Sequence, residues 1–209
     1  QAYNAQHDLE LESWPGLEAQ VAAHADDIAY NAHDIDDGVR AGLFSLDELR
    51  EGAPMVGRVI DAVKRDYPDA ADDRVVAETV RRLIGDWVDD LVSETERRIA
   101  KHKPQSAEDV RAAGLPLVGF SDALREDEAV LRRFLMQRMY RHWKVNRSRS
   151  HAKRIIRELF DLLLAEPELL PPAWQQGNDG PKGQKTARRV CDYIAGMTDD
   201  YCIEEHKRL

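Results

Sequence analysis

Residues 17–43 read LEAQVAAHADDIAYNAHDIDDGVRAGL, and this stretch predicts a long helix with two different faces. A phenol, an imidazole and three carboxylates recur at helical spacing on one stripe: Asp26, Tyr30, His33, Asp34 and Asp37. Apolar residues recur at alternating fours and threes on the opposite stripe: Leu17, Val21, Ala25, Ile28, Ala32, Ile35 and Val39. The sequence therefore predicts a helix over 15–42 that packs through one face and presents polar chemistry on the other.

The polar stripe has two interpretations. A metal or phosphate site needs hard oxygen ligands and proton-transfer groups on a rigid element, and the tyrosine and histidine at these turns favour that interpretation. The alternative is a charged surface stripe that only faces water.

The remaining pattern is helical almost throughout, which predicts an all-α fold. Ser45 to Glu48 fits a capping box that opens a short helix closed by Gly52. Further helices are expected at 55–66, 72–101, 121–142 and 147–165, with terminal helices after a flexible loop at 175–184. Residues 103–120 form one long interruption, in which Ser106 to Asp109 could cap a short helix and Leu115 to Phe120 is a strand candidate too brief for a sheet. Residues 1–209 are expected to form a single helical unit.

Composition indicates a soluble globular protein, since 43% of the residues are hydrophobic and 33% are charged. The sequence contains no apolar run long enough for a membrane helix, and it starts with no signal-peptide pattern, so we expect a cytoplasmic protein without membrane contact. Cys191 and Cys202 are the only cysteines and are expected to be reduced packing residues.

Charge is unevenly distributed along the chain. Residues 1–50 hold eleven Asp or Glu against two arginines, which already equals the net charge of −9 of the whole sequence. The segment 138–157 holds eight Lys or Arg and no acid. An acidic stripe and a basic stripe in one chain suit a metal with a polyphosphate, whereas the overall acidity argues against constitutive coating of nucleic acid.

Two His-Asp dipeptides are candidate metal ligands, because one class of metal phosphohydrolase uses adjacent His and Asp. His7-Asp8 is followed by Pro15 and is expected in a loop, whereas His33-Asp34 lies on the helix predicted over 15–42. Neither dipeptide is identified as a metal site from its residue types alone, since four ligands from three helices must converge on one cation.

At ADDIAYNAHDIDDG, residues 25–38, the chain resembles the bacterial deoxyguanosine triphosphate triphosphohydrolase family, the dGTPase-like enzymes of the HD-domain superfamily. MYRHWKVNR at 139–147 and DYIAGMTDDY at 192–201 occur at the order and spacing of that family. The resemblance implies the C-terminal portion of an HD-type multi-helical bundle, because family members are about twice as long as this chain.

The resemblance also implies an activity and a set of site residues. Family members are generally oligomeric, and they hydrolyse a deoxynucleoside triphosphate to deoxynucleoside and tripolyphosphate with a divalent metal, here expected to be Mg²⁺ or Mn²⁺. By position Asp26 matches the final Asp ligand of the HD site, while Tyr30 and Asp34 match residues that contact the triphosphate and sugar. Tyr140 resembles a second pocket tyrosine near the sugar, and Arg132 is a weaker match to a phosphate-binding arginine. A homo-oligomer is thus expected, and nucleic acid has no specific support as a partner.

Two alternatives stay open. The upstream His and His-Asp ligands of the family have no counterpart in this sequence, so we expect no catalysis by the chain alone. Another HD-superfamily nucleotide phosphohydrolase or phosphodiesterase would share the metal site without the arrangement of Tyr30 and Asp34. A non-catalytic helical module that binds nucleotide or nucleic acid would need no metal site at all.

Overall fold

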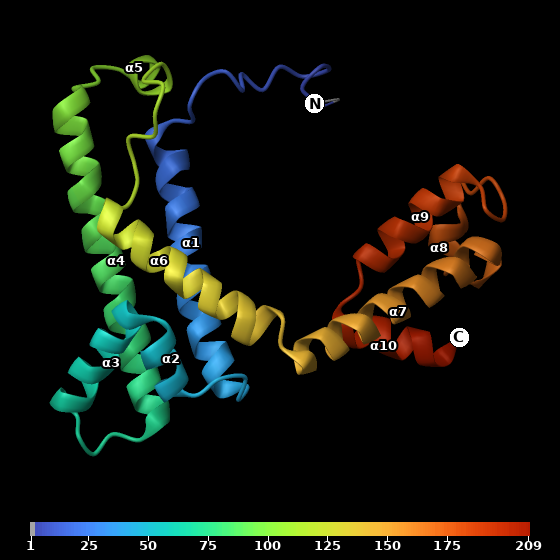
Figure 1. The fold of residues 1–209 in the computed structure, drawn as a ribbon. Coiled ribbons are helices and arrows are strands. Elements are labelled where there is room, and N and C mark those ends of the chain that lie inside the picture. The colour runs from blue at the N-terminus through green and yellow to red at the C-terminus, as the bar shows by residue number, and fades with distance from the viewer. Residues whose placement is uncertain (1–2) are drawn as a thin grey trace. The chain divides into compact units, whose positions relative to one another are not determined.

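The computed structural model describes residues 3–209, and every regular element in that range is a helix (Figure 1). The first part contains α1 Leu17–Arg40, α2 Leu46–Gly52, α3 Pro54–Asp66, α4 Asp72–His102, α5 Ala107–Arg111, α6 Asp122–Leu135 and the π-helix η1 Met136–Tyr140. The second part contains α7 Trp143–Ala165, the 3₁₀-helix η2 Pro167–Leu169, α8 Pro172–Gln175, α9 Gln184–Ala195 and α10 Asp199–Arg208. The all-α prediction is confirmed, and the strand candidate at 115–120 is an irregular loop within this range.

The described chain divides into two compact units, one that ends at His142 and one over residues 143–209, whereas the sequence predicted a single one. Each unit has its own buried apolar cluster. The first cluster extends from Ile28 to Leu135, and the second is built by Leu163, Leu170, Val190 and Tyr193. Hydrophobic periodicity assigns a residue to a buried face but not to a particular core. The sequence pattern therefore could not predict a boundary between two units at His142.

In the first unit, α1 and α4 run antiparallel beside each other, and α6 lies across one side of the pair (Figure 1). The short helices α2 and α3 pack against each other and against α6, and α3 also packs against α4. Ser45 forms the expected capping box with Glu48 at the start of α2. Ser106 forms a second box with Asp109 at the start of α5, which confirms the short helix expected inside the long interruption.

In the second unit, α7 packs against α9 and α10. This helix begins at Trp143, four residues before the expected start at Arg147. No proline or glycine lies between 142 and 147, so nothing in the local sequence delays the helix. Cys191 and Cys202 are both free, but Cys191 is exposed and is not the packing residue that the sequence predicted.

The helix expected at 15–42 is observed as α1, but its faces differ from the prediction. Ile28, Ala32 and Ile35 are buried as expected, whereas Val21 and Ala25 are exposed. Asp34 is buried although it was placed on the exposed polar stripe. It lies eight residues after Asp26, a rotation of about 80° around the helix, which takes it from the centre of the polar face to its boundary.

No helix among residues 3–209 is long and apolar enough to span a lipid bilayer.

Candidate functional site

The first unit brings together three residues that the sequence assigned to a substrate pocket. The hydroxyl of Tyr140 donates a hydrogen bond to Oδ2 of Asp34, 106 positions earlier in the chain. Tyr30, one turn before Asp34 on α1, hydrogen bonds with the same tyrosine side chain. Tyr140 is partly buried and Tyr30 is 58% exposed. The cluster therefore has a buried carboxylate on its inner side and an accessible phenol on its outer side.

A π turn presents Tyr140 to α1. The sequence predicted a continuous helix over 121–142, but α6 ends at Leu135 and η1 follows. The backbone N–H of Arg141 donates to the carbonyl oxygen of Met136 at 3.1 Å, five residues back. A π turn holds more residues than an α turn, so Tyr140 leaves the helix in a direction that a continued α-helix would not give it. Periodicity alone does not reveal such a turn.

Burial governs the protonation of this cluster. The pKa of Asp34 is raised because burial disfavours the charged carboxylate, and the hydrogen bond from Tyr140 opposes that rise only in part. The pKa of Tyr140 is raised by burial and by its hydrogen bonds with Asp34 and Tyr30. Tyr140 therefore remains a neutral hydrogen-bond donor at neutral pH.

A polar seam joins α1 to α6 beside this cluster. Arg132 lies 2.9 Å from a carboxylate oxygen of Asp27 and 2.8 Å from one of Glu128. The amide of Asn31 donates to Oε1 of Glu128 at 3.0 Å. Arg132 thus has two carboxylate neighbours, and an incoming phosphate would have to compete with them for its guanidinium group.

Asp26 is exposed on α1, as are His33 and Asp37. Among residues 3–209 no group of three or more His, Cys, Asp or Glu side chains is arranged to hold a metal ion. His7 and Asp8 lie in an exposed turn, where Oδ1 of Asp8 accepts from the backbone N–H of Glu10 at 2.9 Å. The loop expected for the first His-Asp dipeptide is confirmed.

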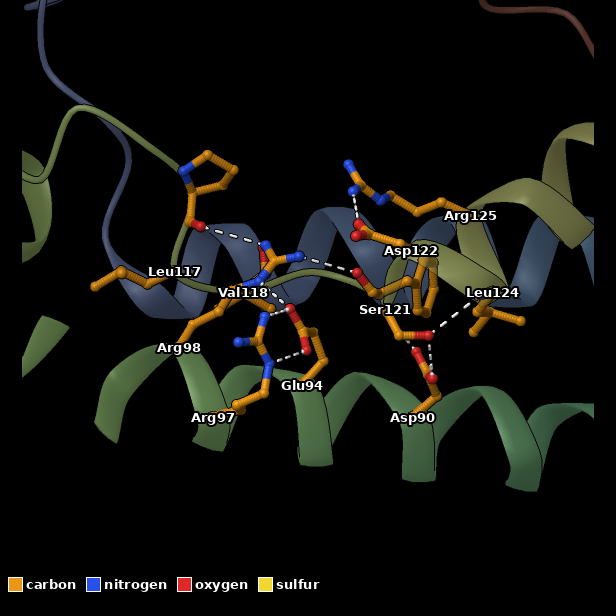
Figure 2. A network of polar contacts seen from close by, with 12 residues as sticks. Asp90, Glu94, Arg97, Arg98, Leu117, Val118, Ser121, Asp122, Leu124 and Arg125 are labelled. Carbon is orange, nitrogen blue, oxygen red and sulfur yellow. Dashed lines mark hydrogen bonds and ion pairs between the residues drawn. The ribbon is translucent and has the colours of Figure 1, made fainter. Parts of the chain in front are cut away.

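The start of α6 is fixed to α4 by a network that sequence reasoning did not find. Figure 2 shows Ser121 above Asp90, whose carboxylate accepts from the Ser121 backbone N–H at 2.9 Å and from its hydroxyl at 2.7 Å. The Ser121 hydroxyl oxygen also caps α6 by accepting from the backbone N–H of Leu124. Because α6 leads into η1, this attachment helps to set where Tyr140 lies.

Arg98 holds the loop that precedes α6. It donates to the carbonyl oxygen of Phe120 at 2.9 Å and to that of Pro116 at 3.3 Å, while Glu94 accepts from its Nε at 2.7 Å (Figure 2). From the other side, Oε1 of Gln20 accepts from the backbone N–H groups of Leu117 and Val118 at 2.9 and 3.0 Å. The buried Gln20 satisfies backbone groups that would otherwise lack partners. The sequence signal that could have found this contact is the position of Gln20 next to the apolar stripe of α1.

The predicted basic segment is spread over both units. In the first unit, Arg138 pairs with Glu48 at 3.1 Å. In the second unit, the first turns of α7 are almost entirely exposed, with the Arg147 guanidinium 5.6 Å from the ring centroid of Trp143 and Arg154 3.0 Å from His151.

The comparisons with known proteins agree with the resemblance. A family described as "Phosphohydrolase-associated domain" matches residues 118–208. A deoxyguanosinetriphosphate triphosphohydrolase-like protein of Parvibaculum lavamentivorans is 58% identical over 207 residues, which is 99% of this chain and 52% of that protein. Proteins of the same name from Caulobacter sp. strain K31 and Azorhizobium caulinodans are 54% and 50% identical and are covered to 52% each. The chain spans about half the length of the curated relatives it matches.

Proposed function

Since the chain resembles deoxyguanosinetriphosphate triphosphohydrolase-like proteins along its whole length, we propose that it supplies one wall of the active site of such an enzyme. The proposed reaction is hydrolysis of a deoxynucleoside triphosphate to a deoxynucleoside and tripolyphosphate. Water adds its oxygen to the α-phosphorus, the bond from that phosphorus to the 5′-oxygen breaks, and the 5′-oxygen takes up a proton.

The observation that carries the proposal is the cluster of Tyr30, Asp34 and Tyr140. Tyr140 comes from a segment more than a hundred residues after Asp34, yet its hydroxyl bonds to that carboxylate. Tyr30 can donate a hydrogen bond to a phosphate oxygen without adding charge, and its exposure leaves it accessible. Asp34 and Tyr140 are proposed to face the sugar, with Arg132 as a source of positive charge for the phosphates.

The described residues do not by themselves fit a divalent metal, because they contain no group of three potential ligands. Asp26 is proposed as one ligand of Mg²⁺ or Mn²⁺, whose other ligands would come from outside the 209 residues. Tyr30 and Asp34 are not proposed as ligands of the same ion. Asp34 lies about 12 Å beyond Asp26 along the helix axis, and its buried carboxylate accepts a hydrogen bond from Tyr140. The phenol of Tyr30 hydrogen bonds with the same tyrosine.

The test is a product assay on a full-length chimera, in which this chain replaces the matching 207 residues of the P. lavamentivorans protein. With deoxynucleoside triphosphates and Mg²⁺ or Mn²⁺, we expect equal amounts of deoxynucleoside and tripolyphosphate, and no turnover by the 209-residue chain alone. The unmodified relative is assayed in parallel as the matched reference.

Other products would contradict the proposal. Release of pyrophosphate or monophosphate would favour a different nucleotide phosphohydrolase of the HD superfamily. Nucleotide binding without turnover by the chimera and by the relative would favour the non-catalytic module.

A further inference from the structure

Two pairs of side chains face each other across the contact between α1 and α6. Asp27 and Asn31 are one turn apart on α1, and Glu128 and Arg132 are one turn apart on α6. Arg132 reaches across to Asp27, and Asn31 reaches across to Glu128. Since Arg132 also contacts Glu128, the four side chains form one connected polar cluster, which we call the α1–α6 clamp.

Within the α1–α6 clamp, Arg132 is held through one edge of its guanidinium group. Its Nε and Nη2 lie 3.1 and 2.8 Å from Oε1 of Glu128, and Nη2 lies 2.9 Å from Oδ1 of Asp27. Within the described residues 3–209, Nη1 of Arg132 makes no hydrogen bond or ion pair. Arg132 is half-exposed, so an anion that reaches the two N–H groups of Nη1 does not have to displace either carboxylate.

Asn31 fixes the carboxylate that holds Arg132. Its Nδ2 donates at 3.0 Å to Oε1 of Glu128, the same oxygen that accepts from Arg132. Asn31 is buried, and the side chain of Glu128 is only 17% exposed. Water competes little for a hydrogen bond in such surroundings, so the position of this oxygen is well defined.

The position of Asn31 on α1 would otherwise suit an apolar residue. It lies three residues after Ile28 and four before Ile35, both of which are buried in the core of the first unit. An apolar side chain at 31 would pack there without the cost of burying an amide. The hydrogen bond to Glu128, and not packing, therefore accounts for the amide at this position.

We propose that Asn31 and Glu128 are positioning residues, which hold the guanidinium group of Arg132 so that its Nη1 edge faces the phosphates of the substrate. This inference rests on the proposed function, which assigns Arg132 to the phosphates. Asn31 adjoins Tyr30, whose phenol is proposed to donate to the same phosphate chain, so one turn of α1 orients both donors. A guanidinium group that is already fixed loses less conformational freedom when substrate binds.

The test is a double-mutant cycle in the full-length chimera. KM and kcat are measured for Asn31→Ala in the unsubstituted background and again in an Arg132→Ala background. A residue that acts only through Arg132 has no effect once that side chain is removed, whereas a residue that only supports the fold has the same effect in both backgrounds. Ile35→Val, one turn further along α1, is the control for a loss of packing without a change in the clamp.

We expect Asn31→Ala to raise KM by about threefold to tenfold. The value of kcat should change little, because the phosphates carry their charge before the reaction begins. In the Arg132→Ala background the same substitution should not raise KM further, and Ile35→Val should not raise it in either background. Equal increases of KM in the two backgrounds would overturn the proposal, as would an unchanged KM for Asn31→Ala in the unsubstituted one.

A second measurement needs no activity. In the 209-residue chain, the Nε–H of Arg132 gives a proton–nitrogen NMR signal that is identified by its loss in Arg132→Lys. This group donates to Glu128, so Asn31→Ala should accelerate its exchange with water by about threefold or more, whereas Ile35→Val should not. Unaltered exchange in Asn31→Ala would overturn the positioning. A chimera without triphosphohydrolase activity would instead refute the proposed function, so the two failures are distinguishable.

Discussion

The hydroxyl of Tyr140 donates a hydrogen bond to the buried carboxylate of Asp34, which links η1 to α1 within the first unit. Tyr140→Phe removes the hydroxyl and keeps the ring, leaving Asp34 without this donor. We expect the free energy of unfolding to fall by about 1 to 3 kcal/mol in urea denaturation of the 209-residue chain. Tyr67→Phe, at an exposed tyrosine, serves as the control and should change it little. Equal effects of the two substitutions would show that the hydrogen bond between Tyr140 and Asp34 does not contribute to the free energy of unfolding.

Asp34→Asn should change how stability depends on pH. Burial raises the pKa of Asp34, so the folded chain holds this proton more tightly than the unfolded chain does. The resulting stabilisation is fully present below the unfolded pKa of about 3.9 and is lost as the pH rises through the raised folded pKa. Asn does not titrate, so the variant should gain stability relative to the wild type between acid and neutral pH. Urea titrations at several pH values measure this, with Asp69→Asn at an exposed aspartate as the control, and a pH-independent difference for Asp34→Asn would refute the assignment.

The attachment of α6 to α4 should contribute measurably to stability. Asp90→Ala removes the acceptor of two hydrogen bonds from Ser121, and we expect a loss of about 1 to 3 kcal/mol in the free energy of unfolding. Asp89→Ala, at the exposed neighbouring carboxylate, should change stability by less than about 0.5 kcal/mol. If the two variants unfold at the same denaturant concentration, the network shown in Figure 2 does not stabilise the unit.

Local sequence signals accounted for most of the helices. The capping boxes at Ser45 and Ser106 operate over a few residues and were confirmed. The apolar periods correctly predicted α1 and α4 as helices, although not the whole buried face of α1. The burial of Asp34 and the pinning of the 117–118 backbone by Gln20 depend on partners about a hundred positions away, which no periodic pattern encodes. The exposure of Val21 has a different origin. Hydrophobic periodicity predicts which face of a helix packs, but it does not identify the element that packs against that face.

The sequence predicted which residues belong to the candidate site but not how they are arranged. The resemblance placed Tyr30, Asp34 and Tyr140 in one pocket, and their clustering in the first unit is consistent with that placement. The carboxylates beside Arg132 were not anticipated, because Asp27 was outside the polar stripe considered. The roles of Asp26, Tyr30, Asp34, Tyr140 and Arg132 toward metal and substrate stay predictions.

Tyr30→Phe in the full-length chimera should weaken substrate or transition-state binding without changing metal affinity. The ring stays in place and one hydrogen bond is lost, so kcat/KM should fall by an amount equivalent to about 1 to 3 kcal/mol. Steady-state kinetics at several concentrations of Mn²⁺ measure this. Recovery of activity with excess metal would instead indicate that Tyr30 acts on the metal.

The most direct test of the central claim, that the polar face of α1 is a wall of the active site, is the turnover of Asp26→Ala in the full-length chimera at saturating metal. Asp26 is exposed and outside the buried core, so its removal should leave the circular dichroism spectrum and melting temperature almost unchanged. We expect tripolyphosphate release to fall below a tenth of the unsubstituted rate, while the control Glu18→Ala at the exposed start of the same helix retains it. A folded Asp26→Ala protein that keeps more than a tenth of the activity would contradict the account.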